Sequence, residues 1–311
     1  EFDFNIMYSQ RGQLTLAHTD ATVRSFRQRA EVNKHFGGRT ELIDPVDIGE
    51  LVPTLNLSPA GLPVLAGLWH QDGATARHDA VAWGYAKGAT QRGVELHQLT
   101  EVTGIEVEAG RVTGVQTNRG RVSAGCVVQA VAGHSAELAQ LAGFQMPIVA
   151  YPLQAMVTQP VKPFLNPLVS SSALHCYVQQ TSRGEIVFGG GSDPYPLYGT
   201  RSTLDLKESL MASAVEMFPF MSEMRLMRQW AGITDMTSDY SPIMGRSPIE
   251  NYYVDAGWGT WGFKATPISG VTMAQLIASG GKVPELIAPF SLDRFDAFRQ
   301  VNEMGATAAS H

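Results

Sequence analysis

The sequence predicts a mixed α/β fold in which two domains interleave along the chain. Strand-like segments with alternating polar and apolar residues recur in both halves of the chain, and helical patterns separate them. One segment, CVVQAV at 126–131, is instead almost wholly apolar. Alternation is typical of an antiparallel sheet with one solvated face, whereas an apolar run is typical of a parallel strand covered on both faces. We therefore expect two different sheets.

Residues 1–70 are expected to belong mostly to the antiparallel sheet. Their predicted elements, in chain order, are a hairpin over 4–17 that turns at Arg11–Gly12, a helix over 19–36, a short helix within 44–55 and a strand within 62–73. Gly37 and Gly38 end the first helix because glycine readily takes the left-handed conformation that follows a helix. Pro53 stops the second helix.

Residues 71–150 change to the pattern of an open sheet. Their predicted elements are a helix over 79–91 with Asp79 as its N-cap, a strand over 94–99, a three-stranded meander within 101–124 with turns at Ala109–Gly110 and Arg119–Gly120, the apolar strand 126–131 and a helix over 135–143. This order is typical of the middle of an open nucleotide-binding sheet that carries an inserted antiparallel layer.

Residues 151–235 predict further antiparallel strands crossed by one helix. The strands are expected within 153–160, 174–180, 185–191 and 226–236, and the helix over 203–218. We interpret this segment as part of a domain that covers a substrate. Residues 236–285 return to the open sheet with a buried strand at 252–255, a Gly-rich loop and a helix over 266–279, and residues 286–311 are a predicted tail.

The composition excludes several classes of function. The net charge is −6 and the lysines and arginines are scattered, so the chain lacks the basic surface that nucleic-acid binding needs. We expect neither a membrane span nor a signal peptide, and no metal-ligand spacing stands out. Cys126 and Cys176 stand in apolar strand contexts and are predicted to be free thiols. This cysteine usage favours the cytoplasm.

The segment AGWGTWGFK, at 256–264, is the most informative motif. Gly257, Gly259 and Gly262 give it the spacing G-x-G-x-x-G, and glycine lets a backbone approach a ligand closely at the positive end of a helix. The motif lies late in the chain, contains two tryptophans and precedes no acidic residue at a strand end, which argues against a dinucleotide phosphate fingerprint. We interpret it as a loop whose backbone N–H groups face the polar edge of a flavin ring.

Five segments together carry a resemblance to a known family. In collinear order, EVTGIEVEAGRVTGVQTNRG, CVVQAVAGHSAELAQLAG, SDYSPIMGRSP and YYVDAGWGTWGFKATPISGVTMAQLI resemble the D-amino acid oxidase and sarcosine oxidase superfamily of FAD amine oxidases. Within it, GATARHDAVAWGYA, at 73–86, is similar to the β subunits of heterotetrameric sarcosine oxidases. The resemblance implies a glutathione-reductase-like FAD-binding domain interleaved with an antiparallel-sheet substrate domain.

The resemblance also implies how FAD is held. Val102 would contact the adenosine end through its backbone, and Gly259 and Gly262 would flank the isoalloxazine ring. Lys264 would be catalytic: its ammonium group would lie beside the flavin, bind the substrate carboxylate and stabilise the anionic reduced ring. Single-chain sarcosine oxidases attach FAD through a cysteine, but Gly232 aligns with that place here, so we expect non-covalent FAD.

A second flavin is implied at the start of the helix over 79–91. In the similar β subunits a histidine at the place of His78 carries covalent FMN, and Arg77 would be a neighbouring FMN contact. A neutral imidazole nitrogen is needed for bonding to the flavin. A helix N-terminus and an adjacent arginine both disfavour the imidazolium form, so the setting suits that chemistry. The alternative for such a histidine is a plain turn residue.

The implied activity is the oxidation of sarcosine by hydride transfer to FAD. Electrons would pass to FMN and then to O2, giving glycine, formaldehyde and H2O2. The implied partners are a larger α subunit and small γ and δ subunits. One alternative is the β subunit of a related amine or proline dehydrogenase with another electron acceptor. Another is a non-catalytic piece for subunit assembly.

The family begins with a strand–GxGxxG–helix unit for the FAD pyrophosphate, an acidic residue for the ribose and a substrate-binding arginine, none of which stands in this sequence. We expect that segment either to precede Glu1 or to be a separate polypeptide. Residues 1–311 alone are therefore predicted to bind FAD poorly, because the phosphate cradle supplies much of the affinity for a dinucleotide.

A few further residues are weaker candidates for the site. His70 is a candidate for lining the FMN or substrate cavity, and His175 for facing the substrate, while a core or surface role explains either of them as well. The aromatic residues Trp258, Trp261 and Phe263 either shape the flavin pocket or serve packing.

Overall fold

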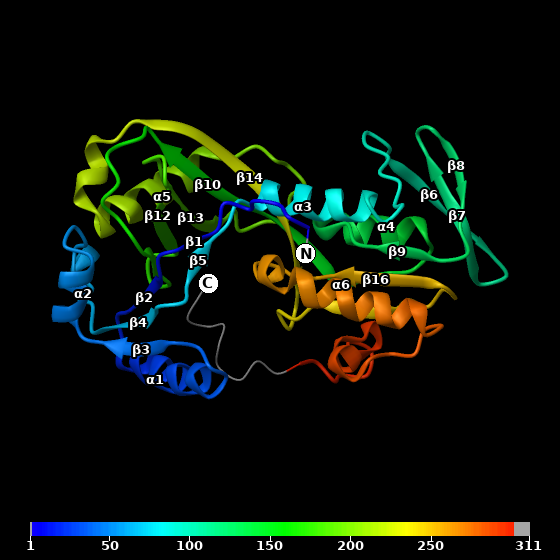
Figure 1. Cartoon of the computed structure of the whole chain (residues 1–311), viewed down its shortest axis with the longest axis horizontal. Coiled ribbons are helices and arrows are strands. Elements are labelled where there is room, and N and C mark those ends of the chain that lie inside the picture. The colour runs from blue at the N-terminus through cyan, green and yellow to red at the C-terminus, as the bar shows by residue number, and fades with distance from the viewer. Residues whose placement is uncertain (1, 302–311) are drawn as a thin grey trace.

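The computed structural model describes residues 2–301 and confirms the mixed α/β fold (Figure 1). Its largest unit is an eight-stranded sheet. The strands of this sheet, in spatial order, are β14 (Leu226–Thr237), β10 (Ile148–Thr158), β13 (Ile186–Ser192), β12 (Cys176–Gln180), β11 (Leu168–Ser171), β2 (Gln13–Ala17), β4 (Ala66–His70) and β3 (Thr40–Ile43). All neighbours pair antiparallel except β11 and β2, which are parallel.

Three smaller sheets complete the strand inventory of the described residues. They are the pair β1 (Ser9–Gln10) and β5 (Ala74–Thr75), the meander β6 (Val102–Glu108), β7 (Arg111–Thr117) and β8 (Gly120–Ser123), and the sheet β15 (Ile243–Arg246), β16 (Tyr252–Ala256) and β9 (Val127–Gln129). β16 and β9 pair in parallel, as the open-sheet prediction requires. The chain thus leaves the large sheet after β4, returns at β10 and leaves it again after β14.

The helices agree closely with the sequence pattern. The α-helices are α1 (Asp20–His35), α2 (Pro45–Leu51), α3 (His78–Thr90), α4 (Ser135–Leu141), α5 (Leu204–Met217) and α6 (Gly262–Ala278). The short 3-10 helices are η1 (Pro59–Gly61), η2 (Ala132–His134), η3 (Pro219–Glu223), η4 (Glu285–Phe290) and η5 (Leu292–Arg294). Asp44 caps α2 by accepting the N–H groups of Val46 and Asp47 at 2.8 and 3.0 Å.

The two faces of the large sheet have different roles. One face packs against α2 and α5 in the main hydrophobic core, where Leu14, Leu16 and Phe188 are buried. On the other face α1 covers β2, β3 and β4, and Phe26 and Ala30 bury its apolar side. The remainder of this second face is the floor of the cavity described below.

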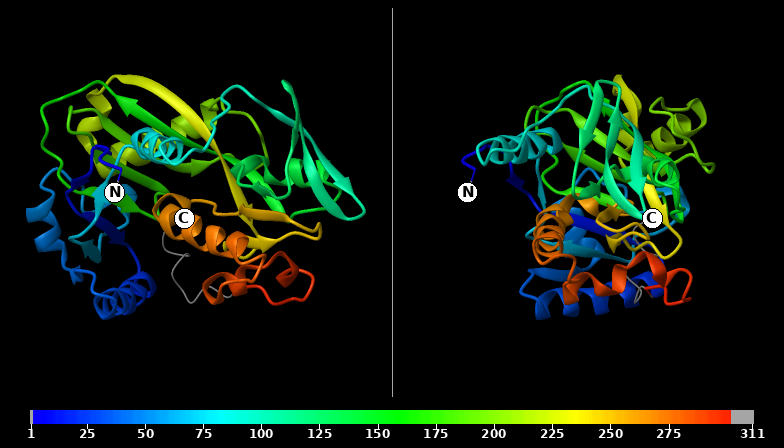
Figure 2. Two further views of the ribbon diagram at one scale, coloured as in Figure 1. Left: turned by 45° about the vertical axis from the view of Figure 1, so that its right-hand side comes forward. Right: turned by 90° about the vertical axis from the view of Figure 1, so that its right-hand side faces the viewer.

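The predicted hairpin over 4–17 is wrong. β1 pairs with β5, whereas β2 pairs with β4 and β11. The chain does turn at Gly12, whose φ is 85°, but the N–H groups of Arg11 and Gly12 donate to the carbonyl of Gly73 at 3.2 and 2.8 Å. These bonds direct the two strands to different partners. The residues before β1 instead run along α3 (Figures 1 and 2), where the side chain of Phe4 packs against Gly84.

Two predictions about the open sheet also need correction. Residues 94–99 form no strand, and Leu99 is 86% exposed. β9 is not covered on both faces, because Val128 is 42% exposed and β9 is hydrogen-bonded on one side only within the described residues. An apolar segment needs neighbouring strands before it can form a buried ladder; among residues 2–301 the segment 94–99 pairs with none, and β9 pairs only with β16.

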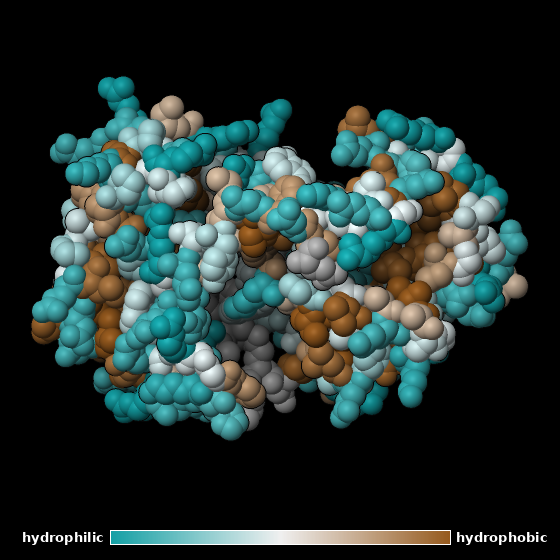
Figure 3. Space-filling model, in the orientation of Figure 1, coloured by the Kyte–Doolittle hydropathy of each residue, from teal (hydrophilic) through white to brown (hydrophobic). Residues whose placement is uncertain are grey.

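Apolar side chains are exposed near β9, the β6–β7–β8 meander and α6. On the face shown in Figure 3, apolar surface surrounds α6 and lies between β9 and the β6–β7–β8 meander. The exposed side chains include Val122 on the meander and Phe263, Ile268 and Val271 on α6. No helix among the described residues has the length and apolarity that crossing a bilayer requires.

The predicted tail, 286–311, is in part well packed. η4 and η5 lie in it, and Arg294 is 2% exposed. Residues 302–311 lie outside the described residues. The domain boundaries given above remain a prediction.

Candidate functional site

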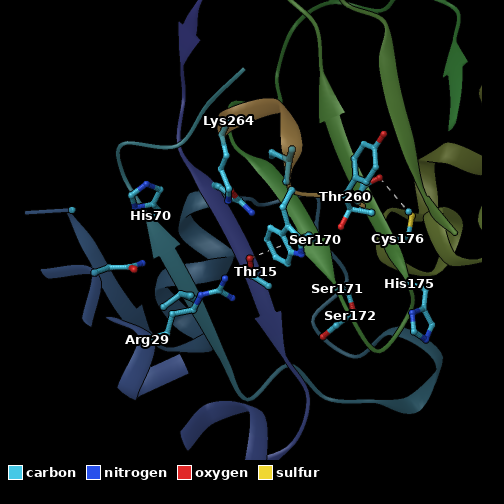
Figure 4. Close-up of a pocket in the computed structure, with 18 of the residues that line it drawn as sticks. Thr15, Arg29, His70, Ser170, Ser171, Ser172, His175, Cys176, Thr260 and Lys264 are labelled. Atoms are coloured by element: carbon cyan, nitrogen blue, oxygen red, sulfur yellow. Dashed lines mark hydrogen bonds between the residues drawn. The ribbon is translucent and has the colours of Figure 1, made fainter. Parts of the chain in front are cut away.

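A cavity of about 650 Å³ opens on the α1 side of the large sheet (Figure 4). Strands β2, β4, β11 and β12 form its floor, α1 forms one wall, and Thr260, Trp261 and Lys264 close the opposite side. Segments that are far apart in the sequence therefore meet here. His70 and His175 also line the cavity, so both weaker histidine candidates lie at it.

Lys264 points into this cavity from the first turn of α6 (Figure 4). Its Nζ atom lies 5.0 Å from the ring centre of Trp261. Partial burial lowers the pKa of Lys264, and the positive charge of Arg29 lowers it further. α6 begins at Gly262, earlier than the predicted 266, because the helix continues through Pro267 instead of starting beside it. This early start places Lys264 on the helix.

The Gly-rich loop is fixed from behind by a residue that the motif analysis missed. Asp235, on β14, is 4% exposed, and its carboxylate accepts the N–H groups of Gly257 at 2.6 Å and Gly259 at 3.0 Å. Burial raises the pKa of Asp235, although these backbone donors act in the opposite direction. The signal that the sequence offered for Asp235 was a single acidic residue in the predicted strand segment ITDM.

These bonds change the interpretation of the loop. The N–H groups of Gly257 and Gly259 point to Asp235, so they are not the donors that a flavin edge would meet. The first turn of α6, from Gly262 to Lys264, supplies N–H groups that have no acceptor within the helix, and no side chain caps this end. The positive end of the helix and the Lys264 ammonium together fit the anionic edge of a reduced flavin.

The loop glycines are required by the fold itself. Gly257 and Gly259 have φ values of 73° and 53°, in the left-handed region. A Cβ on Gly259 would lie 2.8 Å from the Sδ atom of Met236, and one on Gly262 would lie 2.9 Å from Cβ of Trp258. The close approach seen here is therefore to the chain's own residues, and contact of Gly259 and Gly262 with the isoalloxazine stays a prediction.

The residues predicted to hold a second flavin lie at the start of α3. His78 is the first residue of the helix and is exposed. Arg77, not Asp79, occupies the N-cap position, and its guanidinium forms an ion pair with the Asp79 carboxylate. The imidazole of His78 is therefore accessible for attachment at a helix N-terminus. Arg77 would have to share its charge between Asp79 and an FMN.

The structure brings some of the predicted residues together and separates others. Of the residues predicted to be catalytic or to bind a flavin, Lys264 lines the cavity, as do the weaker candidates His70, His175 and Trp261. Val102 begins β6, in the meander, and His78 begins α3, so neither belongs to the cavity wall. A further lining residue, Arg29, was missed, because a polar-faced helix normally carries such charges toward solvent.

Comparison with known proteins gives the site a family context. Residues 1–276 match the family described as FAD dependent oxidoreductase (DAO). The sarcosine oxidase subunit beta of Rhodobacter capsulatus is 42% identical over 311 residues, covering 100% of this chain and 75% of that protein. The sarcosine oxidase subunit beta of Arthrobacter sp is 43% identical over 312 residues, covering 100% of this chain and 77% of that protein.

A solved structure extends this likeness to the fold. An L-proline dehydrogenase from P. horikoshii matches with a TM-score of 0.87 and 30% sequence identity, covering 96% of this chain and 79% of that chain. A glycine oxidase from Geobacillus kaustophilus matches with a TM-score of 0.83 at 21% identity, covering 94% of this chain and 76% of that chain, which shows a shared fold.

Proposed function

Because this chain belongs to the FAD-dependent oxidoreductase family and, within it, to the sarcosine oxidase β subunits, we propose that it oxidises sarcosine with FAD as the immediate electron acceptor. The single observation that carries the proposal is Lys264, which presents a cation to a cavity of about 650 Å³ beside an uncapped helix N-terminus. The carboxylate of sarcosine would form an ion pair with such a cation. FAD, when bound, would accept a hydride from the N-methyl carbon.

The residues of this chain would orient the substrate for that transfer. The Lys264 ammonium would bind the carboxylate and fix which carbon of sarcosine faces the flavin. Its charge and the α6 N-terminus would stabilise negative charge on the reduced ring. Water would then hydrolyse the imine that remains after loss of hydride, releasing formaldehyde and glycine.

We propose non-covalent FAD contacts at Val102, Gly259, Gly262 and Lys264. Asp235 supports this arrangement, since it holds the loop before α6 against β14. The backbone of Val102 would meet the adenosine end. The complete FAD site would also need a phosphate-binding unit, which none of these residues supplies.

We further propose covalent FMN at His78, with Arg77 as its neighbour. The exposed ring of His78, the first residue of α3, supports attachment, because a flavin could reach it from outside the chain. Electrons would leave the substrate site through this second flavin and reduce O2 to H2O2. Trp83, 60% exposed on the same helix, would offer apolar surface to a partner subunit.

We propose an assembly with a larger α subunit and small γ and δ subunits; the name subunit beta, which the relatives carry, supports the presence of further subunits. Cys126 and Cys176 are both free thiols, which favours a cytoplasmic setting. The large sheet and α1 would form the substrate domain within 1–70 and 151–235. Residues 71–150 and 236–285 would form the FAD-binding domain.

Product analysis of the assembled complex tests the proposal. With sarcosine under air we expect formaldehyde, glycine and H2O2 in equal amounts. The 30% identical L-proline dehydrogenase structure favours a second candidate, oxidation of proline with another acceptor. Turnover of L-proline but not sarcosine, without H2O2, would select that candidate. No turnover of either amine by a flavin-loaded complex would favour a non-catalytic assembly role.

A further inference from the structure

We propose that residues 2–8, the N-terminal segment, hold α3 in place and thereby position His78 and Arg77 for covalent attachment of a flavin. The proposal rests on the proposed function and deepens it, because it names the residues that decide whether the second flavin becomes bonded. Its observation is that this segment lies along α3 (Figures 1 and 2) and contacts the helix near both of its ends.

α3 has little other support. No helix or strand of residues 2–301 packs extensively against it. Its buried residues are three small ones, Ala80, Gly84 and Gly88, whereas Trp83 is 60% exposed. A helix of this length is only marginally stable in water without packing. The position of α3 therefore depends on the residues that do cover it.

Two aromatic rings of the N-terminal segment lie against the glycines of α3. A Cβ added to Gly84 would lie 3.3 Å from Cδ1 of Phe4, and one added to Gly88 would lie 2.5 Å from Cδ1 of Phe2. Glycine is a poor helix former, but a residue without a side chain leaves room for these rings. The contact with the segment thus explains why α3 contains two interior glycines.

Two cations hold the same rings from the other side of the contact. Lys87 Nζ lies 5.7 Å from the ring centre of Phe4 and donates to the carbonyl of Asp3 at 3.3 Å. Arg92 Cζ, just after the helix, lies 5.1 Å from the ring centre of Phe2. Attraction between a cation and a ring adds to the packing, so the segment is fastened to the C-terminal half of α3.

The N-terminal segment also fixes the other end of α3, where His78 begins the helix. The N–H of Arg77 donates to the carbonyl of Ile6 at 3.0 Å, which holds the backbone directly before His78. The Arg77 guanidinium forms an ion pair with Asp79, and its Nη1 atom lies 3.8 Å from Met7 Sδ. Residues 6 and 7 therefore contact the backbone and the side chain of Arg77.

These contacts leave His78 accessible. Gly84 and Gly88 are four residues apart, so they lie on one side of the helix. His78 lies about 100° around the helix axis from the middle of that side, and it is exposed. A flavin can therefore approach His78 while the N-terminal segment stays against α3.

Covalent attachment needs a fixed geometry at His78. In this step an imidazole nitrogen bonds to a methyl carbon of the flavin, the methyl group loses one hydrogen and the imidazole loses its N–H proton. The flavin ring takes up two electrons and two protons, and O2 then reoxidises it and becomes H2O2. Since the reacting atoms must come within about 3.5 Å of each other, a displacement of α3 by about 1 Å would slow bond formation strongly.

The experiment measures covalent flavin in the assembled complex. Complex from riboflavin-starved cells is incubated with FAD and FMN, and flavin bonded to the peptide that contains His78 is followed by mass spectrometry. For Phe4→Ala we expect attachment to slow by about 10-fold or more, and for Phe4→Tyr, which keeps the ring, to stay within about 2-fold of the wild type. Phe298→Ala, at a side chain that is 93% exposed, is the matched control and should leave the rate unchanged.

Two further measurements on Phe4→Ala distinguish positioning from general damage. Sarcosine should still bleach the FAD, because no residue of α3 lines the cavity at Lys264. Hydrogen exchange of the α3 amides should become faster on the order of 10-fold, since the helix loses its support.

The outcomes separate this proposal from the proposed function. If the wild type bonds no flavin but exchange in α3 still becomes faster in Phe4→Ala, the N-terminal segment does hold α3 and covalent FMN at His78 is wrong. Attachment at the wild-type rate in Phe4→Ala, or unaltered exchange in α3, would overturn the proposal. So would an equal loss of FAD and of covalent flavin in that variant.

Discussion

The carboxylate of Asp235 accepts the backbone N–H of Gly257 at 2.6 Å, and its other oxygen accepts that of Gly259 at 3.0 Å. This contact joins the end of β14 to the loop before α6. It thereby connects the large sheet, which forms the cavity floor, to the helix that carries Lys264. A shift of this loop would move the Lys264 cation relative to the floor.

Replacing Asp235 with Asn should weaken this connection. The amide has one acceptor oxygen, so one glycine N–H would face an NH2 group, at a cost of about 1–3 kcal/mol in unfolding free energy. We expect lower flavin occupancy together with a lower Tm. Thermal unfolding and the flavin-to-protein ratio measure the two effects. Asp205→Asn, in the first turn of α5, is a control of the same chemistry away from the loop.

The pH dependence of this variant has a definite sign. Burial raises the pKa of Asp235 above 3.8, so the folded state holds the proton more tightly than the unfolded state. The contribution of Asp235 to wild-type stability therefore decreases as pH rises from 3.8 through the raised value. The Tm deficit of Asp235→Asn should be larger at low pH and smaller at neutral pH. A deficit that grows with pH would contradict the raised pKa.

Lys264→Gln should impair catalysis far more than folding. Loss of a charge that stabilises the transition state typically costs 10²–10³-fold in turnover, so we expect kcat/KM for sarcosine to fall by about that factor. Since burial lowers the pKa of Lys264, the wild-type activity should decline at a lower pH than an ordinary lysine would give. Lys264→Arg, which keeps its charge, should lose this alkaline decline. A pH–rate series on the three proteins measures this.

Gly259→Ala should distort the Gly-rich loop before α6. Its φ of 53° and the 2.8 Å separation of an added Cβ from Met236 Sδ predict a loss of about 1–3 kcal/mol. Gly270→Ala, inside α6 with open space around an added Cβ, should instead stabilise by about 0.5–1 kcal/mol. Denaturant unfolding of both variants measures the contrast. Equal stability of the two would contradict the packing described for the loop.

The buried pair of Arg294 and Asp239 should hold the C-terminal 3-10 helices to the β14–β15 connection. Burial alone would raise the pKa of Asp239, but the hydrogen bonds from Arg294 at 2.8 and 2.9 Å, its positive charge and the N–H groups of Val301 and Ser241 together outweigh burial and lower that pKa. The stability that these interactions contribute is present above the ordinary pKa of an Asp carboxyl, and it is lost as pH falls through the lowered pKa of Asp239. Arg294→Leu should cost about 3–5 kcal/mol at neutral pH.

A surface pair provides the comparison for that loss. Arg299 lies 3.5 Å from Asp293, and both side chains are 69% exposed. Arg299→Leu should therefore change the unfolding free energy by less than about 1 kcal/mol. If the two arginine variants lost similar stability, the Arg294 pair would not have the structural role assigned to it.

Local patterns predicted most of the helices and the antiparallel strands. The side-chain spacing of α1 and the capping acid of α2 are properties of short segments, so they could be identified without the fold. The hairpin over 4–17 failed because its two halves find partners at Thr75 and Trp69, which are distant in the sequence. Strand pairing depends on such contacts, and periodicity does not report them.

The residues of the candidate site also differ in whether local sequence could identify them. Lys264 was predicted through the resemblance carried by the glycine-rich motif that it ends; it lines the cavity, and its role there stays a prediction. Arg29 and Asp235 stand in ordinary helix and strand patterns, so only the packing of α1 and β14 reveals them. His78 and Val102 were proposed through resemblance, and their flavin contacts remain predictions.

Anaerobic titration of the assembled complex with sarcosine is the most direct test of the proposed electron path. In the wild type we expect sarcosine to bleach the absorbance of both flavins, and peptide mapping to find one flavin bonded to His78. In His78→Asn the covalent flavin should be lost, and sarcosine should still bleach the FAD. If sarcosine leaves the flavins of a fully loaded complex oxidised while another amine reduces them, the proposed function is wrong.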